Sequence, residues 1–489
     1  MVNRGKPSRN CLPCRKRKLR CDLVPGCCGQ CRRAGLTCVG YRDPEALIFR
    51  DETVNVQQKV TVAQTHAAST QRFNQIHQYL SSQLAKPVTP SIETRARHDF
   101  FAHYVLRESA AYDMLGSIYK NSKPGDHLSA SVDAASLAFL ASKSNNQPHI
   151  TKIATKAYVD ALQALAPVIT QPEAATSDAT VQSILLLDLY EKMTNRSSLT
   201  EDTVRTHLTG ALTLIEKRGT ANTQSVAARR LVERLYITTI LSCAAAGSRV
   251  PQNVQDLRNV LDPFFDHTDL KWLLIKLNIE AITFSADVRS GKIRGPENVI
   301  PQAEMLDRQL ASMETALSPD WKPKRVYVTQ GADRRIFGKY YDVYISHEKT
   351  HIRNMVRTLR LHLHAMMQGF ARGAPHLLDP KSPAIVDACA DQIAASVPQF
   401  LIPGVRPDNA EPFSSVQMLQ CYTLLPQMYL AGRLTSNKAL SEWVFDMMEH
   451  MASVGAMKMA KVTVDTLRTD KSIAYWDIYA LLGGYAFVI

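Results

Sequence analysis

The chain of 489 residues has no long apolar segment and no apolar segment at its start. A membrane-spanning helix needs roughly 18 or more consecutive apolar residues, and no such run is present, so we expect no membrane span. Residues 1–6 are polar and basic, unlike a secretory signal peptide, so we expect a protein that is not secreted. Disulfides are disfavoured in the cytosol and nucleus, where clustered cysteines instead indicate a metal site.

The sequence also lacks the common signatures of enzymes. It contains no P-loop, no dinucleotide-binding G-x-G-x-x-G and no G-x-S-x-G nucleophile elbow. One H-E-x-x-H motif is present, in which His347 and His351 would bind zinc and Glu348 would be the base of a metallohydrolase. No acidic third ligand follows His351 before Asp379. We therefore expect no enzyme, and we interpret the motif as part of a polar helical face on which Thr350 is directed to solvent.

Six cysteines follow the spacing C-x2-C-x6-C-x6-C-x2-C-x6-C, and they are Cys11, Cys14, Cys21, Cys28, Cys31 and Cys38. So short a segment cannot bury a sizeable apolar core, so a metal is needed to hold it. Two tetrahedral zinc ions need eight ligand positions, which six thiolates supply only when two of them bridge both ions. The half-repeat C-x2-C-x6-C occurs twice, and this symmetry predicts that Cys11 and Cys28 are the bridges.

Four further cysteines lie outside this spacing. Cys27 is a rival to Cys28 as a ligand, but it would place three residues instead of two before Cys31 and break the turn geometry of the second half. We therefore favour Cys28 and expect Cys27 to be a spare, half-exposed thiol. The surroundings of the remaining three are apolar and predict core thiols at Cys243, Cys389 and Cys421.

Positive charge is concentrated at the start of the chain. Residues 1–42 hold eleven Lys and Arg residues against Asp22 alone, which is +10 of the formal net charge of +13. Residues 43–489 hold only +3, so the basic character is local. A small and dense cationic segment suits nucleic-acid phosphates. A nuclear-import patch or a merely solvated face is the alternative interpretation of the run Arg15–Arg20, and import is compatible with DNA binding.

The stretch Cys14–Asp22, CRKRKLRCD, together with the cysteine spacing, resembles the DNA-binding domain of the fungal binuclear zinc-cluster (Zn2Cys6) transcription factors. The resemblance implies two Zn²⁺ ions on the six cysteines, bridged by Cys11 and Cys28. It also implies a first short helix whose C-terminal end enters the major groove at a CGG-type triplet, with Lys18 at the position that reads bases. We assign phosphate contacts to the other basic residues of the run, Arg15, Lys16, Arg17 and Arg20.

By the same resemblance we expect a nuclear transcription factor of RNA polymerase II genes, an activator by family tendency, that binds double-stranded DNA as a homodimer or with a heteropartner. By analogy alone, a specialised-metabolite gene cluster is a setting for such a protein. An alternative from another class is a metal-buffering or redox protein on a helical scaffold. The basic run argues against it, because a thiol buffer gains nothing from five positive charges between its second and third ligands.

The sequence predicts a small zinc-stabilised cluster module and a large all-α domain joined by a partly disordered linker. The boundaries are 1–42 for the DNA-binding domain, 11–38 for the cluster within it, 43–97 for the linker and 98–489 for the all-α regulatory domain. The linker is rich in Gln, Thr, Ser and Ala. A weak dimerisation helix in it is one hypothesis, based on the helical spacing of Phe73, Ile76, Leu80 and Leu84.

In residues 98–489, amphipathic helical stretches alternate with Pro, Gly, Ser and Asn breaks, and Arg325–Val328 is the main run that predicts a strand. The length permits one helical array or two packed subdomains. Two stretches, Leu185–Glu191 and His207–Gly219, resemble the fungal-specific transcription factor regulatory domain, the second through H-x2-G-A-x2-L-I/L-x2-R-G. The resemblance implies a domain that modulates activation through a coactivator partner or a small-molecule effector.

The stretch His207–Gly219 predicts a helix with a defined apolar face and a defined end. Leu208 and Ile215 share one face of a predicted helix, Gly210 is expected to allow close approach of a neighbouring helix, and Gly219 is expected to end it. The stretch Glu442–Glu449 mixes acids with aromatics. We favour a packed helix there over an acidic activation segment.

Overall fold

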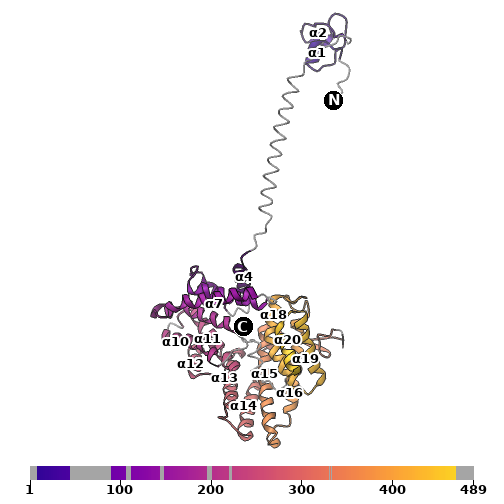
Figure 1. Cartoon of the computed structure of the whole chain (residues 1–489). Helices are drawn as coiled ribbons and strands as arrows, with labels where there is room; N and C mark the ends of the chain where they lie inside the picture. Colours follow the sequence, from indigo (N-terminus) through magenta and orange to yellow (C-terminus); the bar gives the residue numbers. More distant parts are fainter. Residues whose placement is uncertain are drawn as a thin grey trace. The chain divides into compact units, whose positions relative to one another are not determined.

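The computed structural model describes residues 8–43, 90–105, 112–143, 148–194, 201–219, 223–315, 317–329, 331 and 333–469 (Figure 1). The chain divides into two compact units, residues 1–89 and 90–489. We call residues 8–43 the cluster module and the described residues of 90–469 the helical domain. The hypothetical dimerisation stripe in the linker lies outside the described residues.

The cluster module contains two five-residue helices, α1 (Leu12–Lys16) and α2 (Gly29–Arg33). Helices this short are not stable on their own in water. Their buried side chains are cysteines, and the core of the module consists of Cys11, Cys14, Cys21, Cys28 and Cys31. The module is therefore organised around sulfur atoms instead of an apolar core.

The helical domain consists mainly of α-helices, which confirms the predicted all-α class (Figure 1). Its α-helices in chain order are α4 (Ile92–Tyr104), α5 (Leu115–Tyr119), α6 (His127–Lys143), α7 (Pro148–Ile169), α8 (Pro172–Ala175), α9 (Asp178–Thr194), α10 (Glu201–Arg218), α11 (Val226–Ala246), α12 (Gln252–Leu261), α13 (Leu270–Arg289), α14 (Pro296–Thr315), α15 (His347–Ala371), α16 (Ser382–Ser396), α17 (Pro398–Leu401), α18 (Ser415–Leu434), α19 (Lys438–Ser453) and α20 (Lys458–Thr469). Short 3-10 turns are η2 (Asp262–Phe264), η3 (Pro319–Trp321) and η4 (Pro375–Leu377). Within the described residues, no helix is long and apolar enough to cross a membrane.

A two-stranded hairpin interrupts the helices, and it confirms the strand predicted at Arg325–Val328. Strand β1 (Lys324–Tyr327) pairs antiparallel with β2 (Tyr340–Val343). In this register Arg325 lies opposite Asp342, and its guanidinium donates to both carboxylate oxygens at 2.9 and 3.0 Å. The cross-strand ion pair therefore reinforces a hairpin that has few residues to hold it.

Helix ends in the domain carry ordinary capping residues. The hydroxyl of Ser225 accepts from the amide of Ala228 at 2.9 Å at the start of α11, and Ser346 and Ser414 cap α15 and α18 in the same way. Gly247 ends α11 with a left-handed backbone, φ +62°. Such residues satisfy the free amides and carbonyls at helix ends, so these boundaries are encoded locally.

Neighbouring helices in the chain pack against each other, and α15 contacts helices that precede it as well as helices that follow it. It packs against α13 and α14, which precede it, and against α16 and α18, which follow it. The buried apolar residues, from Ala96 to Val464, form one continuous cluster. The helical region is therefore a single packed array and not two subdomains.

Buried polar side chains fix α15 in this array. The guanidinium of Arg357 donates to the Tyr344 hydroxyl and to Asn354 Oδ1, each at 2.7 Å. One turn later, Arg360 donates to the Asp307 carboxylate at 2.7 Å, and the contacts from His364 and Arg360 hold the pKa of Asp307 below its usual range despite burial. Buried charges are tolerated only with such partners, so these contacts specify the register of α14 and α15.

The stretch His207–Gly219 comprises the C-terminal part of α10 and Gly219, the residue that follows its last turn. Leu208 and Ile215 are buried together on one face, and Gly219 follows the helix with φ +55°, so both expectations are confirmed. The expectation for Gly210 is wrong. It is exposed, and a Cβ built there meets nothing within 4 Å. The described neighbouring helices pack on the opposite face of α10, so this glycine packs against none of them.

Two further expectations for the helical domain are confirmed. The stretch Glu442–Glu449 lies inside α19, where Trp443 and Met448 are buried against the core, so it is a packed helix. The three scattered cysteines are all buried core thiols, and they are Cys243, Cys389 and Cys421.

Candidate metal centre and nucleic-acid interface

Each short helix of the cluster module begins at a cysteine. Cys11 is the N-cap of α1 and Cys28 is the N-cap of α2, both with extended backbone. Pro13 stands in the first turn of α1, where its missing amide costs nothing. The Cys28 sulfur accepts from the Cys31 amide at 3.3 Å. The C-x2-C turns therefore place two sulfur atoms on the same side of each helix start.

Two halves of the module repeat the same backbone pattern 17 residues apart, the separation of Cys11 and Cys28. The Arg15 amide donates to the Cys11 carbonyl at 3.0 Å, and the equivalent Arg32 amide donates to the Cys28 carbonyl at 3.0 Å. The amides of Leu19 and Leu36 each donate at 2.9 Å to the second cysteine of their own half. The repeat in the cysteine spacing is therefore also a repeat in structure.

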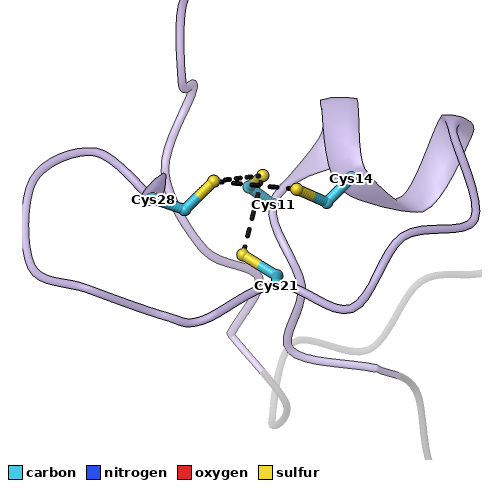
Figure 2. A group of neighbouring side chains, drawn as sticks. All are labelled: Cys11, Cys14, Cys21 and Cys28. Carbon is cyan, nitrogen blue, oxygen red and sulfur yellow. Dashed lines mark hydrogen bonds between the residues drawn. The ribbon is translucent and has the colours of Figure 1, made fainter. Parts of the chain in front are cut away.

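The sulfur atoms form two overlapping groups of four. Cys11, Cys14, Cys21 and Cys28 make one group, drawn in Figure 2, where their sulfur atoms turn toward one another. The other group contains Cys11, Cys28, Cys31 and Cys38. Within each group all sulfur atoms lie within 4.8 Å of one another. Cys11 and Cys28 belong to both groups, which is the arrangement that bridging requires.

These sulfur separations fit tetrahedral zinc. A Zn–S distance of about 2.3 Å places two ligand sulfurs about 3.8 Å apart. The contacts are 3.7 Å for Cys11–Cys28, 3.6 Å for Cys14–Cys28, 3.8 Å for Cys11–Cys21 and 3.7 Å for Cys11–Cys31. A disulfide needs about 2.05 Å, and all ten cysteines are free. The donor set and its spacing therefore suit two ions with shared thiolates.

The thiols differ in how readily they ionise. Burial raises the pKa of Cys14 to about 12 and also raises the pKa of Cys11. Hydrogen bonding from the Cys28 backbone lowers the pKa of Cys38 to about 7. Zinc binds thiolates, so its binding releases protons from the buried thiols, and its affinity falls as the pH falls.

Contacts outside the sulfur atoms hold the second half in place, and sequence reasoning did not anticipate them. Both carboxylate oxygens of Asp22 accept from the Gly29 amide, at 3.1 and 2.9 Å, at the start of α2. The Tyr41 hydroxyl donates to the Val24 carbonyl. Cys27 is half-buried, and its sulfur belongs to neither group of four within the described residues.

The basic residues of the run differ in their exposure. Lys16, Arg17, Lys18 and Arg20 are exposed, and their side chains make no hydrogen bond or ion pair with any described residue of the module. Arg15 is half-buried, and its Nε has no partner among the described residues. In the second half, Arg32 and Arg33 instead donate to carbonyls of their own module, at 3.2 and 3.4 Å. Free cationic side chains are therefore concentrated just after α1.

Lys18 has a left-handed backbone, φ +52°, directly after α1 and its C-cap Arg17. Its amide donates to the Arg15 carbonyl at 3.2 Å. A non-glycine residue in this conformation is strained, and such strain is concentrated at functional sites. Lys18 therefore combines an exposed side chain with a strained backbone directly beyond the helix.

The H-E-x-x-H motif lies in the first turns of α15 and has other partners than a metal. Glu348 forms an ion pair with Lys271 at 3.1 Å, and His351 Nε2 lies 2.9 Å from Gln420 Oε1. Burial lowers the pKa of His347 to about 3 and that of His351 to about 4. Among the described residues, only the cysteine groups are arranged to hold a metal ion.

The solvent-facing position expected for Thr350 is wrong. Its side chain is fully buried, and its hydroxyl accepts from Gln399 Nε2 at 3.1 Å. The rings of His347 and His351 pack near Phe400, with centroids at 4.7 and 5.2 Å. The start of α15 is covered on several faces, so Thr350 is buried with a partner, while His347 and His351 are half-buried and Glu348 is exposed.

Comparison with known families agrees with this site. A model described as the Fungal Zn(2)-Cys(6) binuclear cluster domain matches residues 9–46, and one described as the Fungal specific transcription factor domain matches residues 119–377. The second match covers more than half of the chain. No curated protein and no solved structure matches significantly. Both domains are those of transcription factors, which are typically not enzymes. The chain therefore belongs to the fungal-specific transcription factors, with a binuclear cluster domain that binds two zinc ions and DNA.

Proposed function

We propose that this transcription factor reads a CGG-type triplet with Lys18, at the end of α1 that enters the major groove. The observation that carries the proposal is the exposed, unpartnered Lys18 side chain on a left-handed residue just past the helix. A lysine that donates to guanine O6 and N7 reads sequence in the major groove. Lys16, Arg17 and Arg20 surround it and contact phosphates, with Arg15 contributing less because it is half-buried.

The six cysteines hold the two zinc ions, with Cys11 and Cys28 as bridges. Six thiolates and two zinc ions leave a core charge near −2, and the seven basic residues between Cys11 and Cys38 outweigh it. The loaded module is therefore cationic. Zinc binding folds the module and so positions Lys18, because helices of five residues need an external constraint.

One module contacts few base pairs, so useful specificity needs a second copy, from a homodimer or a heteropartner. The helical domain then acts on RNA polymerase II genes as part of an activator, as in the family at large. For the regulated genes, the same analogy leads us to propose a specialised-metabolite gene cluster.

The test is a binding titration of the zinc-loaded chain against a duplex with CGG half-sites and a duplex in which the central guanine pair of each triplet is changed. The wild type should prefer the CGG duplex. Lys18→Ala should bind both duplexes equally, while Lys16→Ala should weaken both by the same factor. A Lys18→Ala variant that keeps the full CGG preference would overturn the proposal.

A further inference from the structure

A cavity of about 120 Å³ lies in the helical domain. Four helices line it: α11, α13, α15 and α18. These helices pack on one another in sequence, since α13 contacts α11 and α15, and α15 contacts α18. The cavity therefore lies where the early and late helices of the domain meet.

Most of the cavity wall is apolar. Ile237 and Leu241 come from α11, Leu274 from α13, and Ile352 and Met355 from α15. Walls of this kind favour an organic ligand over water, because each water needs two to four polar partners.

Two side-chain amides in the wall have no hydrogen-bond partner within the described part of the chain. Asn278 of α13 and Gln427 of α18 are 8% and 2% exposed. Neither Asn278 Oδ1 nor Gln427 Oε1 has a partner among the described residues, and no hydrogen bond from either amide nitrogen to those residues is present. More than nine in ten buried polar groups in proteins are hydrogen-bonded, so two unpaired amides beside one apolar cavity call for an external partner. Their oxygens are fully enclosed, so it is their N–H groups that an acceptor on a ligand would meet.

The remaining polar groups leave the cavity without net charge. Lys271 and Glu348 line it and neutralise each other at 3.1 Å, and both are partly exposed, so this pair lies where the cavity meets solvent. His351 is held by Gln420 at 2.9 Å, and burial lowers its pKa to about 4, so the ring is neutral near pH 7. A charged ligand would therefore be buried without an opposite charge in the cavity wall to neutralise it.

We propose that this cavity is a binding site for a neutral small molecule with an apolar body and an amide, lactam or hydroxyl group that pairs with Asn278 and Gln427. An apolar cavity of about 150 Å³ accommodates benzene, so the enclosed part of the ligand is about the size of one six-membered ring. Binding joins α13 to α18. This site is independent of DNA reading by the cluster module.

The test uses benzamide as a probe and benzoate as its charged counterpart, titrated into the zinc-loaded full chain by ligand-observed NMR or calorimetry. Benzamide should bind saturably at one site per chain, and benzoate at least about tenfold more weakly because it brings a buried charge. Gln427→Met and Asn278→Leu keep the side-chain volume and remove one amide. Each should weaken benzamide about five- to tenfold while the thermal midpoint stays equal or rises, since an unpaired buried amide is removed.

The matched control is Gln302→Met, which removes an exposed amide beside a separate cavity between α13 and α14. It should leave benzamide binding unchanged. No saturable binding to the wild type, or equal binding by all variants that keep the wild-type thermal midpoint, would show a hydrated cavity and overturn the proposal. If the wild type shows no CGG preference in a parallel DNA titration, the function proposed above is contradicted, and the proposal of this cavity as a binding site is not.

Discussion

Lys18 and Gly35 occupy the same position in the two halves of the cluster module. They are 17 residues apart, like the bridging pair Cys11 and Cys28, and both are left-handed, with φ +52° and +61°. The amide of each donates to the carbonyl three residues earlier, at 3.2 and 3.3 Å. The second half uses the residue that this backbone favours, and the first half uses a lysine at a cost in strain. This contrast supports a role for the Lys18 side chain beyond folding.

We predict that Lys18→Gly separates the backbone strain at this position from the role of the lysine side chain. It should raise the stability of the zinc-loaded module by about 1 kcal/mol, because glycine adopts the left-handed backbone without strain, and it should abolish CGG preference. Gly35→Ala should lower stability by about 1 kcal/mol and leave the preference intact, since its added Cβ meets nothing within 4 Å. Chelator competition measures the stability of the zinc-loaded module, and DNA titration measures the CGG preference.

Leu23 provides the matched control for this comparison. It is also left-handed, φ +54°, and its equivalent in the second half is Gly40, φ +85°. Leu23→Gly should relieve strain by a similar amount without changing base preference. A loss of CGG preference in Leu23→Gly as large as in Lys18→Gly would mean that the strain itself, and not the ammonium group, sets specificity.

The exposed cations at the end of α1 and just after it should control the salt dependence of DNA binding. Lys16→Ala, Arg17→Ala and Arg20→Ala should each reduce the slope of log K against log salt by about 1, because each removes one phosphate contact. Zinc retention should not change with salt in any of them. A wild-type slope near zero would instead favour the metal-buffering interpretation of the cysteines.

Asp22 should stabilise the metal centre through α2. Asp22→Ala removes the acceptor of the Gly29 amide at the helix start and should weaken zinc retention by about 1 kcal/mol, while Asp22→Asn should retain part of the effect. Gly29→Ala should also weaken it, since a Cβ there would lie 2.6 Å from Asp22 Oδ2. Equal zinc retention by the wild type and Asp22→Ala in chelator competition would show that this contact does not stabilise the metal centre.

The helical domain should lose stability as the pH falls, in part through His351. Burial lowers its pKa from 6.5 to about 4, so between these values the unfolded chain binds a proton that the folded chain does not. Its contribution is complete above pH 6.5 and is lost as the pH falls through this window, by about 2 kcal/mol at pH 5. Denaturant unfolding at pH 7 and pH 5 should show a smaller loss for His351→Gln.

His376 is exposed and serves as the control for this titration. His376→Gln should lose as much stability as the wild type between pH 7 and pH 5. An equal loss in the wild type and His351→Gln would contradict the assignment.

The sequence was most informative where residue chemistry repeats along the chain. The cysteine spacing and the charge run predicted a zinc cluster beside a cationic segment, and the helical periodicity predicted the all-α class. The same repeat contains a signal that was overlooked: Gly35 and Gly40 stand opposite Lys18 and Leu23, which indicates left-handed positions in both halves.

The failures come from tertiary burial, which periodicity alone does not reveal. Gly210 is exposed because the neighbours of α10 pack on its other face, and Thr350 is buried because α15 is covered on several sides. The Asp22 contact with Gly29 depends on a turn between them that spacing does not define. The linker and the exact domain boundaries remain predictions.

The most direct test of the account is to measure zinc content and CGG binding on the same samples of the full chain while a chelator removes the metal. We predict two zinc ions per chain before chelation and a loss of CGG binding in proportion to the zinc removed, restored when zinc is added back. Fewer than two ions per chain, or undiminished CGG binding by the metal-free chain, would contradict it.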